Sequence, residues 1–183
     1  MNLKVRKAFK SDRQEISDIV IAAFGDVQGQ EVSDLITDLL ADSSARPLVS
    51  LVATIDDTIV GYILFTNAHI KHFERNVSSA ILAPLSVHPE FQNLGIGGRL
   101  IKEGLKKLKT MGVELVFVLG HPSYYPKYGF SIAGINGFDA PYPISPENSG
   151  AWMVQELHAG TVEDVSGQVI CAEALNDPKY WRE

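Results

Sequence analysis

The sequence predicts an α/β fold built on a mixed, strongly twisted sheet of six or seven strands flanked by helices. A strand–helix–strand order around residues 80–119 implies a parallel crossover connection. Two β-branched, apolar segments between residues 49 and 66 flank Asp56-Asp57, which is typical of an antiparallel hairpin. Parallel and antiparallel neighbours together predict a mixed sheet.

The N-terminal part predicts one short strand followed by two helices. Leu3 and Val5 alternate with charged residues, as in a strand. Ser11 or Asp12 is placed to cap a helix, and a second helix is predicted over residues 29–41. The apolar stripe of the first helix comprises Ile16, Ile19, Val20 and Ala23.

The next segment predicts three strands. The hairpin strands span residues 49–55 and 58–66, and the polar residues 67–76 predict a loop. Residues 79–87 form a further strand, interrupted by Pro84. A proline inside a strand marks an edge, a bulge or a break in the hydrogen-bond ladder.

A long amphipathic helix follows over residues 96–111, and Gly112 ends it. Residues 113–119 are almost all apolar, as in a strand buried on both faces. Residues 123–128 predict a short helix.

The C-terminal part predicts an irregular stretch and then two strands, at residues 152–157 and 162–171. The chain has no internal repeat and no linker long enough to divide domains. We therefore expect one domain over residues 1–183, with a core at 3–133 and a C-terminal part at 134–183.

Composition excludes several classes of partner. The net charge of −6 and the pI of about 5.3 argue against nucleic acid and mildly favour a cationic amine substrate. The single cysteine, Cys171, allows neither an internal disulfide nor a cysteine-based metal site, and it is interpreted as a small core residue. No apolar run is long enough to span a membrane, and the N-terminus lacks a signal core, so the expected location is the cytosol.

The segment at residues 84–100 carries most of the chemistry. A strand runs into a turn containing Gly95, Gly97 and Gly98, and the turn opens the amphipathic helix. The first amides of a helix have no internal partners and lie at the positive end of the helix dipole. Glycines remove the Cβ atoms that would hold a diphosphate away from them, so the turn predicts an anion site.

Three ligand classes use such a turn. A nucleotide-binding P-loop needs Gly-Lys-Ser/Thr, which Gly97-Gly98-Arg99 lacks. A dinucleotide fold needs a third glycine where Leu100 stands, and an acid near the end of the next strand, where Leu119-Gly120-His121 offers none. Coenzyme A is the remaining class.

The sequence resembles the GNAT superfamily of N-acetyltransferases. Residues 92–97, Gln-Asn-Leu-Gly-Ile-Gly, are similar to its Gln/Arg-x-x-Gly-x-Gly/Ala signature, and residues 125–130 resemble its Tyr-x-x-x-Gly-Phe. Residues 84–87, 118–125 and 141–142 resemble a bacterial subgroup of acetyltransferases. The resemblance covers nearly the whole chain.

This resemblance implies transfer of an acetyl group from acetyl-CoA to a primary amine by direct attack, with no metal. It also implies that the strands ending at residue 87 and starting at residue 113 splay apart to admit the thioester, with a bulge at Pro84. The implied cofactor-binding residues are Leu85, Ser86, Val87, Gln92, Asn93, Leu94, Gly95, Ile96, Gly97, Gly98 and Arg99.

The resemblance places the general acid for the leaving thiolate at Tyr125. Tyr124 and Tyr128 are close in sequence, so which of the three tyrosines acts stays open. The base that deprotonates the amine is also open. His121 and Glu31 are the main candidates, with His88 as a third.

Two further clusters have alternative interpretations. His69, His72 and Glu74 have a metal-like spacing, but on a polar loop we interpret them as solvated. Arg99 and Lys102 either form a solvated helix face or meet the 3′-phosphate of the cofactor.

A second functional class fits the same resemblance, namely a non-catalytic acyl-CoA sensor or interaction module. The acceptor amine, the acyl-chain preference and the oligomeric state, a homodimer included, are not determined by the sequence.

Overall fold

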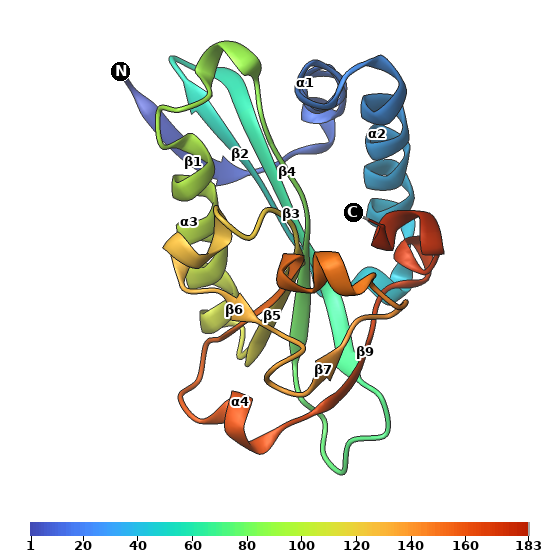
Figure 1. Cartoon of the computed structure of the whole chain (residues 1–183). Coiled ribbons are helices and arrows are strands. Elements are labelled where there is room, and N and C mark those ends of the chain that lie inside the picture. The colour runs from blue at the N-terminus through green and yellow to red at the C-terminus, as the bar shows by residue number, and fades with distance from the viewer. Residues whose placement is uncertain (183) are drawn as a thin grey trace.

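The computed structural model describes residues 1–182 and has the predicted mixed α/β architecture (Figure 1). The sheet follows the order β1-β2-β3-β4-β5-β8-β6, and β7 and β9 join through β3. β4 and β5 pair in parallel, whereas β1 to β4 are antiparallel neighbours. The strands are β1 (Leu3–Lys7), β2 (Val49–Ile55), β3 (Thr58–Ile70), β4 (Ser79–Val87), β5 (Leu115–Leu119), β6 (Ser131–Ile132), β7 (Phe138–Asp139), β8 (Trp152–Glu156) and β9 (Gly167–Ile170).

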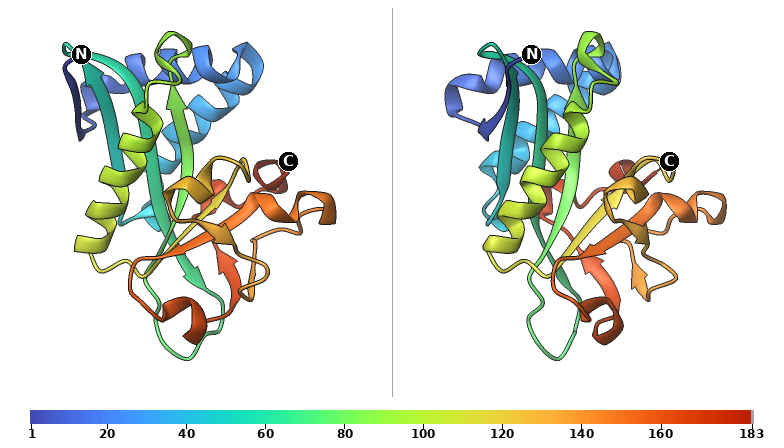
Figure 2. Two further views of the ribbon diagram at one scale, coloured as in Figure 1. Left: turned by 60° about the vertical axis from the view of Figure 1, so that its left-hand side comes forward. Right: turned by 90° about the vertical axis from the view of Figure 1, so that its left-hand side faces the viewer.

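Helices cover both faces of the sheet, as Figures 1 and 2 show. α1 (Arg13–Phe24) and α2 (Asp26–Ala41) pack on one face through an apolar stripe. α3 (Ile96–Thr110) packs on the other face through Leu100, Ile101 and Leu108. The short helix α4 (Thr161–Asp164) lies near the C-terminal strands. Each face therefore has its own apolar core, with the sheet between them.

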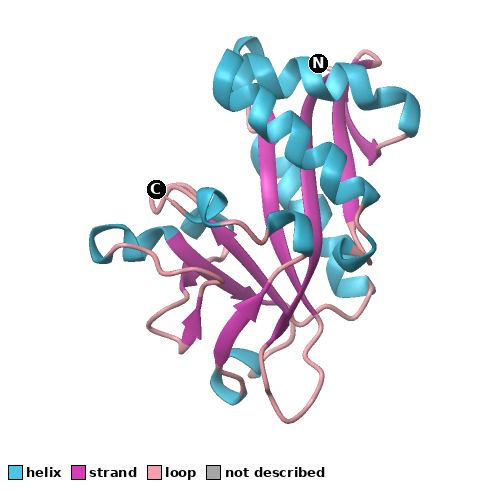
Figure 3. Ribbon diagram, turned by 90° about the vertical axis from the view of Figure 1, so that its right-hand side faces the viewer, coloured by secondary structure: helices cyan, strands magenta, loops and turns pink. Residues whose placement is uncertain are grey.

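The predicted bulge at Pro84 is confirmed. Ile63 of β3 pairs with Leu85 and Phe65 pairs with Leu82, so two residues of β4 oppose a single residue of β3. Pairing with β5 stops at the same place, because the last parallel pair is Leu82 with Val118. Beyond it β4 stays paired with β3 only, and the long strands separate from the C-terminal group (Figure 3).

Long-range pairing corrects two of the sequence predictions. The expected loop at residues 67–76 is strand up to Ile70, because His69 and Ile70 pair with β9 near the C-terminus. The expected strand at residues 162–171 is the helix α4 followed by β9, with positive φ angles at Gly160 and Gly167 on either side of α4.

Helix starts also differ from the predictions. α2 begins at Asp26, three residues before the predicted start at residue 29. Asp12 precedes α1 but makes no side-chain cap there. Its carboxylate instead accepts hydrogen bonds from Arg6 at 2.8 Å and from the Phe9 amide at 2.7 Å, which ties the end of β1 to the start of the helix.

The C-terminal segment folds back against α2 (Figure 1). Asp42, just after α2, accepts a hydrogen bond from the Ala174 amide at 2.9 Å. Trp181 is buried and its ring meets that of Trp152 edge-on at 5.7 Å. No helix within residues 1–182 combines the length and apolar character that crossing a membrane requires.

Candidate active site

The outer end of β4 has a free backbone edge. The amide of His88 donates to the Val60 carbonyl at 2.9 Å, so residue 88 faces β3. Alternation along an antiparallel pair then turns the backbone groups of Leu85 and Val87 away from β3, into the gap left where β5 has stopped. This edge can accept an extended ligand as an added strand.

The turn after β4 is held by side chains. The side-chain amide of Gln92 donates to the Val87 carbonyl at 3.0 Å, and Nδ1 of His88 accepts from the Glu90 amide at 3.2 Å. Asn93 and Gly95 both have positive φ angles, of 63° and 80°. Asparagine and glycine are the residue types that adopt this conformation at least cost. The chain therefore reverses sharply into α3.

The amides at this turn have no acceptor. In the described part of the chain, no hydrogen bond is made by the backbone N–H groups of residues 93–98. The first intrahelical bond at this end runs from the Arg99 amide to the Gly95 carbonyl at 3.0 Å. Asn93, Leu94 and Gly95 are exposed, so a ligand can reach their side of the turn. A run of unsatisfied amides at a helix start is an anion-binding arrangement.

The 3-10 helix η4 (Tyr125–Tyr128) faces this turn from the end of β5. The carbonyl of His121 accepts from the Tyr124 amide at 3.1 Å, and Gln155 donates to the Tyr128 carbonyl at 2.7 Å. Tyr125 is buried, with its ring 5.7 Å from that of Phe130. The position of η4 is thus determined by β5 and β8.

Tyr124 and Tyr128 lie against the start of α3, a contact that was not predicted from the sequence. Model Cβ atoms built on Gly97 and Gly98 would overlap the hydroxyls of Tyr124 and Tyr128. Because both residues are glycines, the two phenols can lie against the first turn of α3. Adjacent glycines facing a Tyr-x-x-x-Tyr segment were the available signal for this contact.

A model of the acetyltransferase (GNAT) domain family matches residues 4–133 of the chain. This chain belongs to the GNAT family. The match contains β4, the turn, α3 and η4, the elements that form the candidate site.

Relatives of this GNAT protein span most of its length. It is 45% identical over 165 residues to the uncharacterized N-acetyltransferase YjhQ of Escherichia coli (strain K12), covering 90% of this chain and 89% of that protein. The crystal structure of the Escherichia coli GNAT protein YhbS, solved in complex with CoA, has a TM-score of 0.85 and 25% identity. That match covers 97% of this chain and 93% of the other.

A GNAT acetyltransferase from Brucella melitensis, solved in complex with acetyl-CoA, gives a TM-score of 0.73 at 27% identity. That match covers 95% of this chain and 98% of the other. The predicted family and fold class are therefore confirmed, and the chain is a GNAT N-acetyltransferase.

The candidate bases of this GNAT protein do not converge on one point. His121 is exposed at the end of β5. Glu31 lies on α2, on the opposite face of the sheet from Tyr125, and its carboxylate is 3.8 Å from Nζ of Lys179. His88 lies at the turn, with its ring packed against Phe91 at 5.9 Å.

Three further residues considered in the sequence analysis are Arg99, Cys171 and His69. Arg99 lies within 3.5 Å of Glu103, one turn along α3. Burial raises the pKa of the Cys171 thiol to about 11, so it stays protonated at neutral pH. His69 lies on β3 rather than on a loop, and within residues 1–182 no three His, Cys, Asp or Glu side chains are arranged to hold a metal ion.

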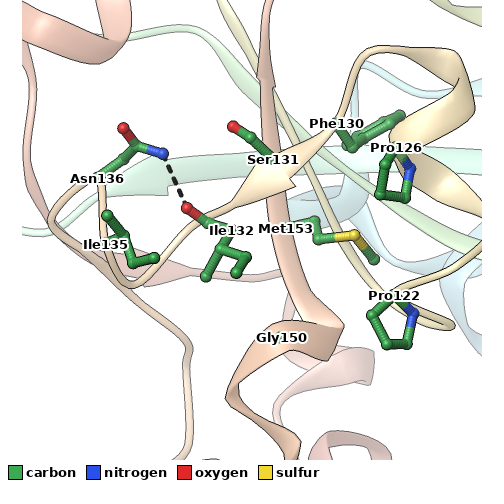
Figure 4. Close-up of a pocket in the computed structure, with 9 residues that line it drawn as sticks. All are labelled: Pro122, Pro126, Phe130, Ser131, Ile132, Ile135, Asn136, Gly150 and Met153. Carbon is green, nitrogen blue, oxygen red and sulfur yellow. Dashed lines mark hydrogen bonds between the residues drawn. The ribbon is translucent and has the colours of Figure 1, made fainter.

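An apolar cavity of about 410 Å³ adjoins η4 (Figure 4). Phe130, Met153 and Pro126 form its wall beside Tyr125, and Ile132 and Ile135 line its outer rim. Its one side-chain amide, Asn136, donates to the Ile132 carbonyl at 2.8 Å. With no charged lining residue, the cavity is not an anion site.

Proposed function

We propose that this protein transfers an acetyl group from acetyl-CoA to a primary amine by direct attack. One observation carries the proposal, namely that the unpaired amides of residues 93–98 lie where the free edge of β4 ends. Membership of the GNAT family supports it. Two structural relatives, from Escherichia coli and Brucella melitensis, were solved with CoA and acetyl-CoA respectively.

The proposed cofactor site has two parts. Main-chain amides from Asn93 to Gly98 bind the pyrophosphate, because they are unsatisfied dipoles at a helix start. Leu85 and Val87 pair their free backbone groups with the pantetheine arm, as an added strand would. In this proposal the gap beyond Leu82 receives the thioester, and Arg99 contacts the 3′-phosphate.

The reaction needs an oxyanion donor and two proton transfers. The neutral amine attacks the thioester carbonyl, and the carbonyl oxygen becomes an oxyanion that accepts a hydrogen bond from the Leu85 or Val87 amide. The intermediate collapses by breaking the C–S bond, and the leaving thiolate takes a proton from Tyr125. A base takes the proton that the amine nitrogen loses. His121, His88 and Glu31 are the groups proposed for that step.

Release of free thiol tests the transfer. Acetyl-CoA is mixed with the protein and a panel of polyamines, amino acids, aminoglycosides and peptide N-termini. We expect thiol release with at least one amine and a loss of about 10²- to 10⁴-fold in Tyr125→Phe. Tyr142→Phe is the control, because its hydroxyl donates to the Asn176 carbonyl near the C-terminus.

Two results would contradict this proposal. The first is tight binding of acetyl-CoA without release on any amine, which would favour the non-catalytic sensor. The second is equal stabilisation against heat by coenzyme A, ATP and NAD, because the turn lacks the P-loop lysine and the third glycine of a dinucleotide site.

A further inference from the structure

Two phenol hydroxyls lie at the start of α3. Cβ atoms on Gly97 and Gly98 would meet the hydroxyls of Tyr124 and Tyr128, and both glycines are buried. The same position on Gly97 lies 3.7 Å from Cδ2 of Leu85. Tyr124 therefore reaches the point where the free edge of β4 and the first turn of α3 come together.

The two phenols form a pair. Their ring centroids are 5.3 Å apart. Burial, and then a hydrogen bond with Tyr128, raise the pKa of Tyr124 above its ordinary value. Its hydroxyl accordingly stays protonated at neutral pH. A neutral phenol can donate a hydrogen bond to an anion, which a phenolate cannot do.

Two lysines flank the pair. Nζ of Lys127 lies 4.9 Å from the centre of the Tyr124 ring, and Nζ of Lys102 lies 6.0 Å from that of Tyr128. Neither lysine forms a salt bridge with any residue between 1 and 182. The pair of phenols is thus flanked by two positive charges that form no salt bridge within the described residues, in a protein whose net charge is −6.

We propose that Tyr124 and Tyr128 form a second wall of the coenzyme A site and donate hydrogen bonds to its pyrophosphate from the side of η4, while Lys102 and Lys127 add charge. This inference rests on the proposed function. It gives Tyr124 and Tyr128 a role in binding, separate from that of Tyr125, whose ring packs in the core beside Phe130.

The reason is the number of acceptors on the ligand. Each non-bridging oxygen of a pyrophosphate can accept more than one hydrogen bond, so phenol donors can add to the amides of the turn, and hydrogen bonds to charged groups are stronger than neutral ones. Phenols at this turn supply further hydrogen-bond donors to the pyrophosphate without adding a buried charge. Glycine at both facing positions is what lets the rings approach.

The test compares two ligands by calorimetry, coenzyme A and pantetheine, the second by competition because it lacks the pyrophosphate. We expect Tyr124→Phe and Tyr128→Phe to weaken coenzyme A binding by about tenfold or more. Pantetheine binding should stay unchanged. Tyr142→Phe is the matched control, and unfolding midpoints identify any variant that has lost its fold.

A second readout is the tyrosine absorption difference on adding coenzyme A. It should shrink in Tyr124→Phe and Tyr128→Phe and persist in Tyr142→Phe. Unchanged coenzyme A affinity in both variants would overturn the inference alone. An equal loss for pantetheine would do the same, because it would mean that the phenols act only through packing. No binding of coenzyme A by the wild-type protein would instead overturn the proposed function.

Discussion

The side-chain amide of Gln92 donates a hydrogen bond to the backbone carbonyl of Val87 across 3.0 Å. The bond joins the last residue of β4 to the turn that opens α3. It also occupies the acceptor at the end of the free strand edge, which leaves the amides of Leu85 and Val87 as the donors there. The strand that would hold pantetheine and the turn that would hold pyrophosphate are thereby held in one orientation.

Gln92→Ala should weaken coenzyme A binding by about two- to fivefold, the effect of one exposed hydrogen bond that orients the turn. The free energy of unfolding should change little, because Gln92 is exposed. Calorimetric titration measures the first and urea unfolding the second. Gln14→Ala is the control, because Gln14 donates a comparable bond to Asp18 on α1. Equal affinities for the two variants would contradict the role given to Gln92.

Gly98→Ala should destabilise the fold by about 1–3 kcal/mol, although alanine is the better helix former by about 1 kcal/mol. The new Cβ would meet the ring and hydroxyl of Tyr128. The affinity for coenzyme A should fall as well, because the clash displaces Tyr128 from the start of α3. Urea unfolding and titration measure both effects. Gly134→Ala serves for comparison, since nothing lies within 4 Å of the Cβ it would add. A more stable Gly98→Ala protein would refute the close approach of Tyr128.

Stability should decline at acid pH through Asp42. Burial favours the neutral carboxyl, but hydrogen bonds from the Ala174 amide and from Ser44 outweigh it and hold the pKa of Asp42 below its ordinary value. The stabilisation is therefore complete above the unfolded-state pKa of about 3.9 and is lost as the pH falls through the lower folded-state value.

Unfolding of wild type and Asp42→Asn, followed in urea from neutral pH to about pH 3, measures this dependence. We expect the variant to lose about 1 kcal/mol at neutral pH and to depend less on acid. Asp38→Asn, exposed on α2, should behave as wild type. A variant with the full acid dependence would exclude Asp42 as the titrating group.

Trp181→Ala should cost about 3–5 kcal/mol of unfolding free energy, the range for deleting a large buried aromatic side chain. Trp181 is 3% exposed, and its indole N–H donates to the Leu175 carbonyl at 3.0 Å. Thermal and urea unfolding measure the loss. The neighbouring substitution Arg182→Ala removes an exposed side chain and should be close to neutral. Similar stabilities for both variants would mean that the C-terminal segment is not part of the cooperative fold.

Local signals predicted much of the structure between residues 79 and 112. The predicted strand at residues 79–87 has the same bounds as β4, and the bulge falls at Pro84. Gly112, with a φ of 88°, lies two residues after the last residue of α3, Thr110, close to the predicted end of the helix. Proline lacks an amide proton and glycine lacks a Cβ, and each affects the backbone only within a few residues of its own position. A short sequence pattern can therefore detect both effects.

Features that depend on long-range contacts were not predicted from the sequence. β3 continues to Ile70 because β9, a hundred residues later in the chain, supplies the hydrogen bonds. The phenols of Tyr124 and Tyr128 face Gly97 and Gly98 because β5 and β8 position η4 against α3. The Tyr-x-x-x-Gly-Phe motif pointed to Tyr125 as the functional tyrosine, and its role as general acid stays a prediction.

By itself the sequence determined the α/β class, the GNAT family and the glycine turn at residues 92–97, because each depends on a short pattern whose physics is local. Only the tertiary structure decided which tyrosines lie beside the turn, how far β3 extends and where Glu31 stands relative to Tyr125. These features depend on backbone and side-chain groups that are distant in the chain. Such groups come into contact only when the sheet has formed and both of its faces are packed.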